Sequence, residues 1–331
     1  MTAAIEQHVI NMTIESPHQI KRRVRGVVAA VTCVCAMLGA LTACTAAAPA
    51  QQRMFSSPED AVRALVDATK TGNLEQVVAI FGPDGQQLVD SSDVTTARRN
   101  REVFIAAVAE HWQLADQPNG GKVLVIGNEG WPFPVPLTKD AGGWRFDTAA
   151  GKEEVLARRV GRNELAVIRI SQTYAAAQRL YAERGHDGRR TGLYAPTFRS
   201  EPGRQNGLYW PAGRGEKRSP LGDLVAHAAQ EGRPVGQDGA QPSPFHGYYF
   251  RILTAQGPAA PGGARDYIVD GEMSGGFALI AWPAQYEVTG VMTFIINQDG
   301  VVREKDLGTG TDAAARAMSV YDPDPSWTPA Q

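Results

Sequence analysis

Cysteine is scarce in this sequence of 331 residues. The three cysteines are Cys33, Cys35 and Cys44, and all lie within or at the end of one apolar segment near the N-terminus. A chain cleaved just before Cys44 keeps a single cysteine, at its first position. Because a disulfide needs two cysteines at a fixed separation, the sequence predicts a folded part without an internal disulfide.

Histidine is too sparse to suggest a metal site. After Cys44 the only histidines are His111, His186, His227 and His246, and none lies three or four residues from another. Zinc requires three or four convergent ligands, so we expect no metal and no cofactor. The sequence also lacks a His-Glu-x-x-His motif, a Gly-x-Ser-x-Gly elbow, a phosphate-binding loop and a dinucleotide-binding glycine fingerprint. The sequence does not exclude a catalytic triad, because triads are defined by geometry rather than by spacing in the sequence.

An excess of positive charge is missing as well. Four of the 33 basic and two of the 35 acidic residues precede Cys44, which leaves 29 basic and 33 acidic residues from Cys44 onward. Proteins that bind nucleic acid neutralise phosphates with surplus Lys and Arg. The charge balance therefore argues against a nucleic-acid partner.

The N-terminus has the layout of a secretory signal. A basic patch at residues 21–25 precedes an apolar run from Gly26 to Ala43, an order typical of exported proteins. The run ends in Leu41-Thr42-Ala43-Cys44, which resembles the lipobox of bacterial lipoproteins. The resemblance implies cleavage before Cys44 and lipid on its thiol. It also implies a membrane-attached protein that faces the periplasm or the cell exterior.

Residues 1–43 are thus predicted to be a signal peptide, and residues 44–54 a flexible, alanine-rich tether. The membrane is then a partner through lipid on Cys44, because several acyl chains give stable attachment. An uncleaved anchor stays open, since the apolar run is near the length of a spanning helix. A twin-arginine signal at Arg22-Arg23 and a start at Met12 instead of Met1 also stay open.

Residues 55–150 are predicted to form an N-terminal α+β domain, because helices come first and a small antiparallel meander follows. A capping serine, a proline and two acids at Ser57-Pro58-Glu59-Asp60 favour a helix start. Two further helices are expected from Leu74 to Phe81 and from about Thr95 to Trp112, and extended segments at 122–127, 131–137 and 144–147. This order resembles the cystatin-like cone domains of exported lipoproteins.

Residues 151–331 are predicted to combine a long helix with an antiparallel sheet. Apolar residues step by three and four along about Lys152 to Arg184, with an interruption near Gly161. Residues 186–241 are rich in Gly, Pro and Arg and are expected to form a long loop with one helix, Leu221 to Gln230. Strands are expected at 248–253, 267–269, 277–282, 292–296 and 301–305. The predicted fold class is therefore α+β, with two small antiparallel sheets and packed helices joined by a long helix.

Four sequence blocks carry a family resemblance. They are Trp131–Pro134, Gly161–Glu164, Gly207–Pro211 and His246–Gly257. Together they resemble the exported bacterial family called domain of unknown function 2950, over nearly all of the chain from Phe55 to Trp327. The resemblance implies family membership and no particular activity.

The C-terminal half also resembles the globular domain of pseudopilins. The shared features are a helix with Tyr174 and Tyr181, the strands that follow, and an Asp-Gly turn between Phe294 and Arg303. Pseudopilins pair one helix with a four-stranded antiparallel sheet. Their apolar N-terminal half-helix is missing here, so a shared fold would not by itself imply fibre assembly.

His246 is the best single candidate for a catalytic residue, because it begins an aromatic strand where a long loop returns. A general base needs an acidic partner to orient it, and Asp266, Asp270 and Glu272 are candidates. The alternative is a histidine that bonds to the backbone at the end of a strand.

Three Trp-Pro pairs suggest a binding surface instead. They begin at Trp131, Trp210 and Trp282. Exposed together, such rings would bind glycan strands or an apolar patch of a partner; buried, they are corners of the core.

Two functions remain open from the sequence. The first is an exported, lipid-anchored envelope protein that binds a protein partner or a cell-wall polymer without catalysis. The second is a periplasmic hydrolase that uses His246 and a nearby carboxylate.

Overall fold

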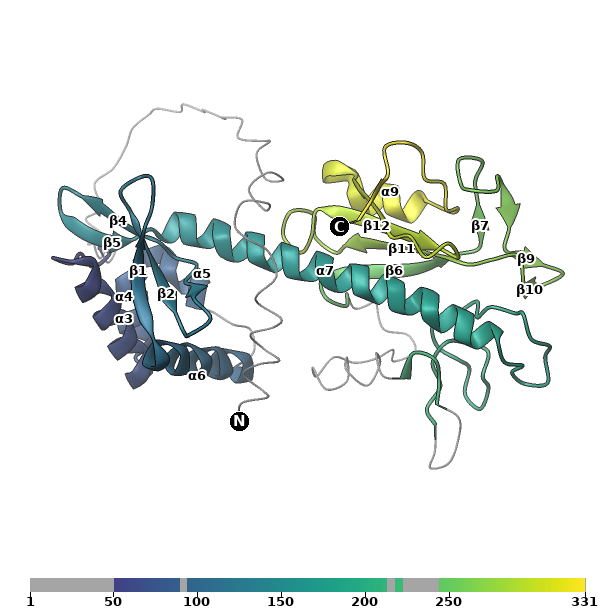
Figure 1. Ribbon diagram of the computed structural model, residues 1–331, viewed down its shortest axis with the longest axis horizontal. Helices are drawn as coiled ribbons and strands as arrows, with labels where there is room; N and C mark the ends of the chain where they lie inside the picture. The colour runs from purple at the N-terminus through teal and green to yellow at the C-terminus, as the bar shows by residue number, and fades with distance from the viewer. Residues whose placement is uncertain (1–50, 90–93, 213–217, 223–243, 331) are drawn as a thin grey trace, which may run out of the picture. The chain divides into compact units, whose positions relative to one another are not determined.

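The computed structural model describes residues 51–89, 94–212, 218–222 and 244–330 (Figure 1). The predicted signal peptide, Cys44 and most of the tether lie outside these residues, as does the predicted helix from Leu221 to Gln230 apart from its first two positions. Within the described ranges, every helix is too short or too polar to cross a bilayer.

The fold is α+β, with small antiparallel sheets, packed helices and one long helix that joins the two regions. The chain divides into two compact units, one ending at Arg158 and the other beginning at Arg159. The division falls inside helix α7 (Thr148–Ala182), so the long helix starts in the first unit and continues in the second.

Helices of the first unit begin and end at the residues that the sequence indicates. The hydroxyl of Ser57 accepts the backbone N–H of Asp60 at 3.1 Å, and Gly72 ends the helix in a left-handed conformation. The side chain of Asn73 caps the next helix by accepting the N–H of Gln76 at 3.0 Å. The helical elements are α3 (Pro58–Thr71), α4 (Leu74–Phe81), the 3-10 turn η1 (Pro83–Gly85), α5 (Gln86–Val89) and α6 (Val94–Glu110).

The sheet of the first unit follows α6 directly. Its strands are β1 (Trp112–Asp116), β2 (Lys122–Ile126), β3 (Trp131–Pro132), β4 (Leu137–Asp140) and β5 (Gly143–Phe146). They lie in the order β1-β2-β4-β5, and β3 pairs with β2. The prediction of a helix reaching Trp112 is wrong at its end, because Trp112 already pairs with Ile126 in the sheet.

Phe133 is the aromatic centre of the first unit's core. Its ring lies 5.5 to 6.5 Å, between centroids, from four others: Phe81, Phe104, Trp131 and Phe146. Such aromatic contacts add to the free energy of apolar burial. The Trp131–Pro134 block therefore supplies aromatic rings to the core. Pro132 cannot donate a backbone hydrogen bond, which is consistent with β3 being only two residues long.

The second unit contains a five-stranded antiparallel sheet in the order β14-β13-β12-β11-β6. Every residue of β11 is buried, and Tyr174 on α7 donates its hydroxyl to the carbonyl of Ala278 at 3.1 Å. The sheet strands are β6 (Tyr248–Leu253), β11 (Ala278–Pro283), β12 (Met292–Asn297), β13 (Arg303–Asp306) and β14 (Thr328–Pro329). Two small hairpins pair β7 (Ala255–Gln256) with β8 (Arg265–Asp266), and β9 (Ile268–Val269) with β10 (Glu272–Met273). The 3-10 turn η2 (Gly308–Gly310) leads into α9 (Thr311–Ala317).

Helix α7 is continuous over 35 residues, which corrects the predicted interruption near Gly161. Glycine costs a helix interior about 0.5–1 kcal/mol relative to alanine, and the packing on both sides of Gly161 outweighs that cost. The helix also starts earlier than predicted, at Thr148, whose buried hydroxyl donates to the carbonyl of Phe81 at 2.6 Å.

Candidate functional site

Two of the four family blocks meet where α7 crosses the start of β12. Asn163 donates from Nδ2 to the carbonyl of Thr289 at 2.8 Å. The carboxylate of Glu164 accepts the backbone N–H groups of Val291 and Met292 at 2.9 and 3.0 Å. These polar side chains are thus used to attach the helix to the sheet.

Tyr248, from the fourth of these blocks along the chain, completes the same contact. Its buried hydroxyl donates to the carbonyl of Met292 at 3.0 Å and lies 3.5 Å from the Glu164 carboxylate. Burial, and then the neighbouring Glu164, raise the pKa of Tyr248 well above its usual range. The phenol therefore stays protonated at neutral pH and acts as a structural donor.

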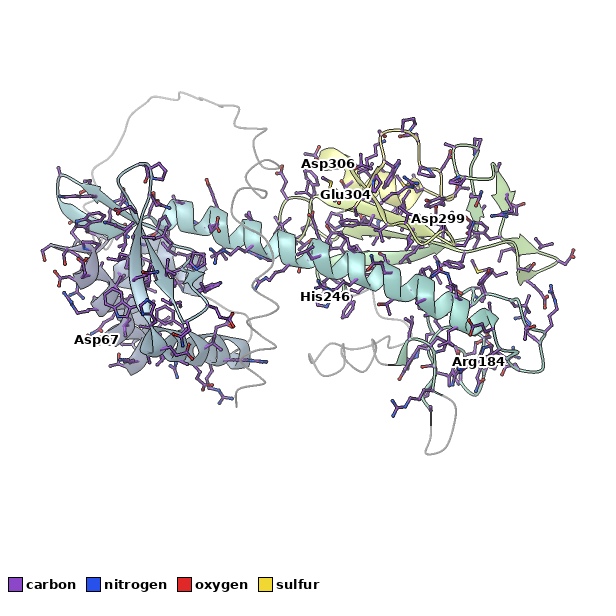
Figure 2. The ribbon with its side chains drawn as sticks, viewed as in Figure 1. Asp67, Arg184, His246, Asp299, Glu304 and Asp306 are labelled. Carbon is purple, nitrogen blue, oxygen red and sulfur yellow. The ribbon has the colours of Figure 1, made fainter. Side chains whose placement is uncertain are left out.

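His246 lies at the opposite end of β6 from its candidate partner Asp266. His246 precedes β6 and has a positive φ of 47°, and its ring meets that of Phe245 at 4.5 Å. Asp266 pairs with Ala255 beyond the other end of β6. The six residues of β6 span about 20 Å, and Figure 2 shows His246 beside α7. The structure does not bring His246 and Asp266 together.

Asp270, the other candidate partner, is exposed at the turn between β9 and β10, with a positive φ of 52°. Glu272, in β10, forms ion pairs with Arg189 at 3.0 Å and Arg190 at 3.3 Å. Both acids belong to the hairpin that follows β8, on the Asp266 side of β6. Like Asp266, these two acids therefore lie beyond the opposite end of β6 from His246.

The three Trp-Pro tryptophans do not form one exposed surface. Trp131 is half-buried in the first unit, with the Arg158 guanidinium 5.3 Å from its ring. Trp282 is buried in the second unit and donates from Nε1 to Asp312 at 2.9 Å. Trp210 is also buried in the second unit. Two of the three rings are therefore parts of the core.

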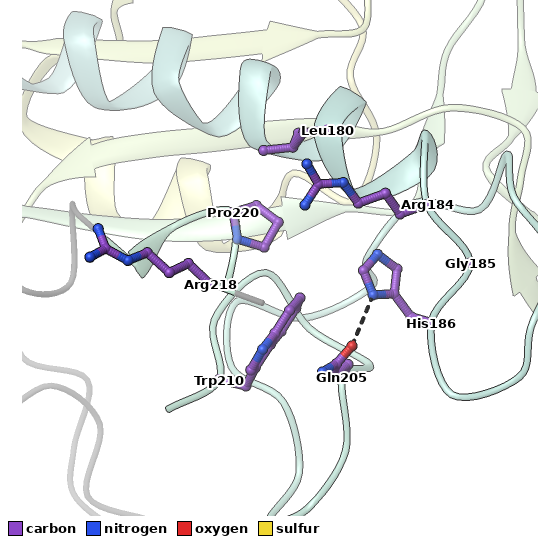
Figure 3. Close-up of a pocket in the computed structure, with 8 residues that line it drawn as sticks. All are labelled: Leu180, Arg184, Gly185, His186, Gln205, Trp210, Arg218 and Pro220. Carbon is purple, nitrogen blue, oxygen red and sulfur yellow. Dashed lines mark hydrogen bonds between the residues drawn. The ribbon is translucent and has the colours of Figure 1, made fainter. Parts of the chain in front are cut away.

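A small pocket lies just beyond the C-terminal end of α7, and it is the candidate site (Figure 3). The imidazole of His186 stacks on Tyr181 at 4.0 Å, and the Trp210 ring meets it edge-on at 5.4 Å. His186 Nε2 donates to the carbonyl of Tyr181 at 3.1 Å, and Nδ1 lies 3.3 Å from the amide oxygen of Gln205. The pocket is lined by Arg184, His186, Gln205, Trp210, Arg218 and Pro220, among others.

The pocket is held by hydrogen bonds between its own loops. Tyr181 donates its hydroxyl to the carbonyl of Gln205 at 2.7 Å, and Gln205 donates its backbone N–H to the carboxylate of Asp187 at 2.9 Å. Partial burial raises the pKa of Tyr181 above its ordinary value. The phenol of Tyr181 therefore stays protonated and donates its hydrogen bond. Together with the bond from Gln205 to Asp187, it joins the loops that form the walls of the pocket.

Positive charge is concentrated around this pocket. The described residues 184–212 and 218 include six basic and two acidic residues, although the part of the chain from Cys44 onward is net negative. Glu272 neutralises part of the charge through Arg189 and Arg190. In the described part of the chain, Arg184 forms no ion pair. A site of this kind favours an anionic ligand.

The sequence did not single out this pocket, although its Gly207–Pro211 block and the arginine-rich loop were both visible. The pocket exists only because residues 184–186, 205–210 and 218–220 fold together. No three His, Cys, Asp or Glu side chains come close enough to hold a metal ion among the residues that the structure describes.

Comparison with known proteins identifies the family and no individual relative. Residues 52–330 match the family described as "Protein of unknown function (DUF2950)". No curated protein and no solved structure matches the chain. The resemblance of the second unit to pseudopilins is not confirmed.

Proposed function

The chain belongs to the DUF2950 family, whose description assigns no activity, and from the chemistry of its own residues we propose a binding function. The protein is a lipid-anchored component of the cell envelope that binds an anionic partner without catalysing a reaction. The observation that carries this proposal is the pocket at the end of α7, with Arg184 beside a prearranged aromatic wall. Arginine is suited to recognising carboxylate and phosphate oxygens.

The envelope location is supported by the N-terminal sequence. The basic patch, the apolar run and Leu41-Thr42-Ala43-Cys44 are typical of a bacterial lipoprotein. The folded part begins close behind, since Gln52 donates from Nε2 to the carbonyls of Ile80 at 3.0 Å and Phe146 at 2.7 Å. A short tether between Cys44 and Gln52 fits a globular protein held at a membrane surface.

The separation of His246 from the acids that the sequence offered as its partners weakens the hydrolase alternative. A hydrolase needs a base in hydrogen-bond reach of its substrate and a partner that orients the base. Here β6 separates His246 from Asp266, and Asp270 lies in the hairpin beyond Asp266. The hydroxyl of Tyr248, the first residue of β6, is already used in a hydrogen bond to the carbonyl of Met292.

Two measurements test the proposal. Metabolic labelling with a fatty-acid analogue should label the wild-type chain and not Cys44→Ala, and label on that variant would contradict the anchor. In-cell crosslinking followed by mass spectrometry and wall-polymer analysis should recover an acidic protein or an anionic polymer with the wild-type chain. Recovery of neither, or turnover of an envelope substrate that His246→Ala abolishes, would contradict non-catalytic binding.

A further inference from the structure

The pocket beside His186 is narrow. Its volume is about 30 Å³, and a single water needs roughly 10–15 Å³. The cavity therefore has room for about two or three oxygen atoms, which is less than a sugar ring needs. A ligand that fits it must insert a small terminal group and leave its remainder outside.

The groups around the cavity favour a negatively charged insert. Figure 3 shows the side chain of Arg184 extending across the pocket, above the ring of Trp210 and beside Pro220. Arg218 lies in the opposite part of the wall. Each guanidinium offers several N–H donors in a fixed plane, which matches the oxygens of phosphate and carboxylate.

The nearby acids are already engaged by other groups. Asp187 accepts the backbone N–H of Gln205 at 2.9 Å, and Glu201 forms an ion pair with Arg204 at 3.3 Å. Glu272 is occupied by Arg189 and Arg190. Among the described residues, none of these acids forms an ion pair with Arg184, and its guanidinium lines the pocket.

A buried hydroxyl next to the pocket lacks a hydrogen bond. Ser219 stands between Arg218 and Pro220, which both line the cavity, and its Oγ has no partner among the described residues. Buried hydroxyls are nearly always bonded to protein or water. Ser219 thus adds a buried polar group beside the residues that line the pocket.

We propose that this cavity binds the oxyanion groups, phosphate or carboxylate, that project from an anionic envelope polymer. The inference rests on the proposed binding function and names its site and its ligand class. A polymer with oxyanion groups projecting from a repeating backbone can place one group in the cavity while the remainder stays outside. The buried Trp210 ring and the Tyr181–His186 stack fix the depth at which those oxygens stop.

The test uses the full-length lipoprotein, purified in detergent, and measures affinity at constant salt. The probes are poly(glycerol phosphate), which carries phosphate, polyglucuronate, which carries carboxylate, and a polyglutamate peptide of equal charge. Arg184→Gln removes the charge at the pocket. Arg169→Gln is the matched control, because Arg169 is exposed on the same helix and forms no ion pair among the described residues.

We expect one or both polymers to bind the wild type and Arg169→Gln equally well. Arg184→Gln should bind at least about tenfold more weakly, since it loses charge-assisted hydrogen bonds. Inorganic phosphate should compete if poly(glycerol phosphate) is the better ligand, and glucuronate should compete if polyglucuronate is. Equal weakening by the two variants would reduce the effect to general charge and overturn the site. Tightest binding of polyglutamate would overturn the polymer class.

The same variants separate this inference from the proposed function. If in-cell crosslinking recovers an anionic partner equally with the wild type and Arg184→Gln, the binding function stands and the pocket is not its site. If neither protein captures a partner and no probe binds, both proposals fail. Urea unfolding of both variants should match that of the wild type, which excludes misfolding as the cause.

Discussion

Glu164 on α7 and Met292 on β12 are joined by a hydrogen bond of 3.0 Å from the backbone N–H of Met292 to the carboxylate. The same carboxylate oxygen accepts the N–H of Val291 at 2.9 Å. The Glu164 side chain is buried, with 8% of its surface exposed. One side chain therefore satisfies two backbone donors and fixes where the helix meets the sheet.

Replacing Glu164 with alanine should destabilise the second unit by about 2–4 kcal/mol, because it leaves two partly buried N–H groups without an acceptor. Glu164→Gln should cost less, since its amide oxygen still accepts. Urea unfolding followed by tryptophan fluorescence measures both. Glu183→Ala, an exposed carboxylate just after α7, should change stability by less than about 0.5 kcal/mol. Equal effects of Glu164→Ala and Glu183→Ala would contradict the assignment.

Replacing Gly161 with alanine should stabilise the protein by about 0.5–1 kcal/mol, because alanine loses less backbone freedom in a helix interior. A Cβ at this position meets no atom within 4 Å, so no steric cost opposes the gain. Thermal unfolding should show a higher midpoint. A lower midpoint would mean that the helix needs flexibility at Gly161 and is not uniformly helical there.

Replacing Gly290 with alanine should have the opposite effect. A Cβ there would overlap the phenol of Tyr248, and overpacking of a rigid core costs typically 1–3 kcal/mol, so we expect at least about 2 kcal/mol. Gly310→Ala is the control, because its Cβ would enter open space. The two variants are compared by urea unfolding, and a neutral Gly290→Ala would show that Tyr248 can move aside.

Tyr267 should make stability fall at alkaline pH. It donates its hydroxyl to Gln256 at 2.9 Å, and burial raises its pKa to about 12. An unfolded tyrosine ionises near pH 10, so the unfolded chain loses its proton first. The stabilisation is therefore complete below about pH 10 and is lost as pH rises through about 12. Tyr286, whose pKa is also raised to about 12 by burial, contributes in the same direction.

The urea midpoint, measured from about pH 8 to 12, checks this dependence. Tyr267→Phe should fall less steeply above about pH 10 than the wild type, because it has no proton to lose. Below that pH the difference between the two proteins should be constant. An unchanged alkaline slope in Tyr267→Phe would contradict the effect.

Local chemistry explains which helix ends could be predicted. Ser57, Gly72 and Asn73 act within three residues of their own position, so their effect is visible in the sequence. The boundary between α6 and β1 could not be predicted in this way. Trp112-Gln113-Leu114-Ala115-Asp116 lacks β-branched residues, and it becomes a strand only because β2 pairs with it.

The candidate site depended on long-range contacts that the sequence does not encode locally. Asp266 was a candidate partner because a general base at His246 needs an acid to orient it, yet β6 runs between the two residues. His186, Gln205 and Trp210 looked unrelated, yet stacking and hydrogen bonds join them. The family blocks correctly indicated the family. Within them, the side chains of Glu164 and Tyr248 form hydrogen bonds that hold the fold together.

The hydrogen bonds of Gln52 to Ile80 and Phe146 attach Gln52 to the first unit. They therefore also limit how far the first unit can begin from Cys44. Eight peptide units connect Cys44 to Gln52, and a fully extended chain of that length reaches about 30 Å at most. With lipid on Cys44, as proposed, Gln52 would stay within that distance of the bilayer surface. A longer tether would then increase the distance from the bilayer at which the protein can bind a partner, and it would leave the contacts of the fold unchanged.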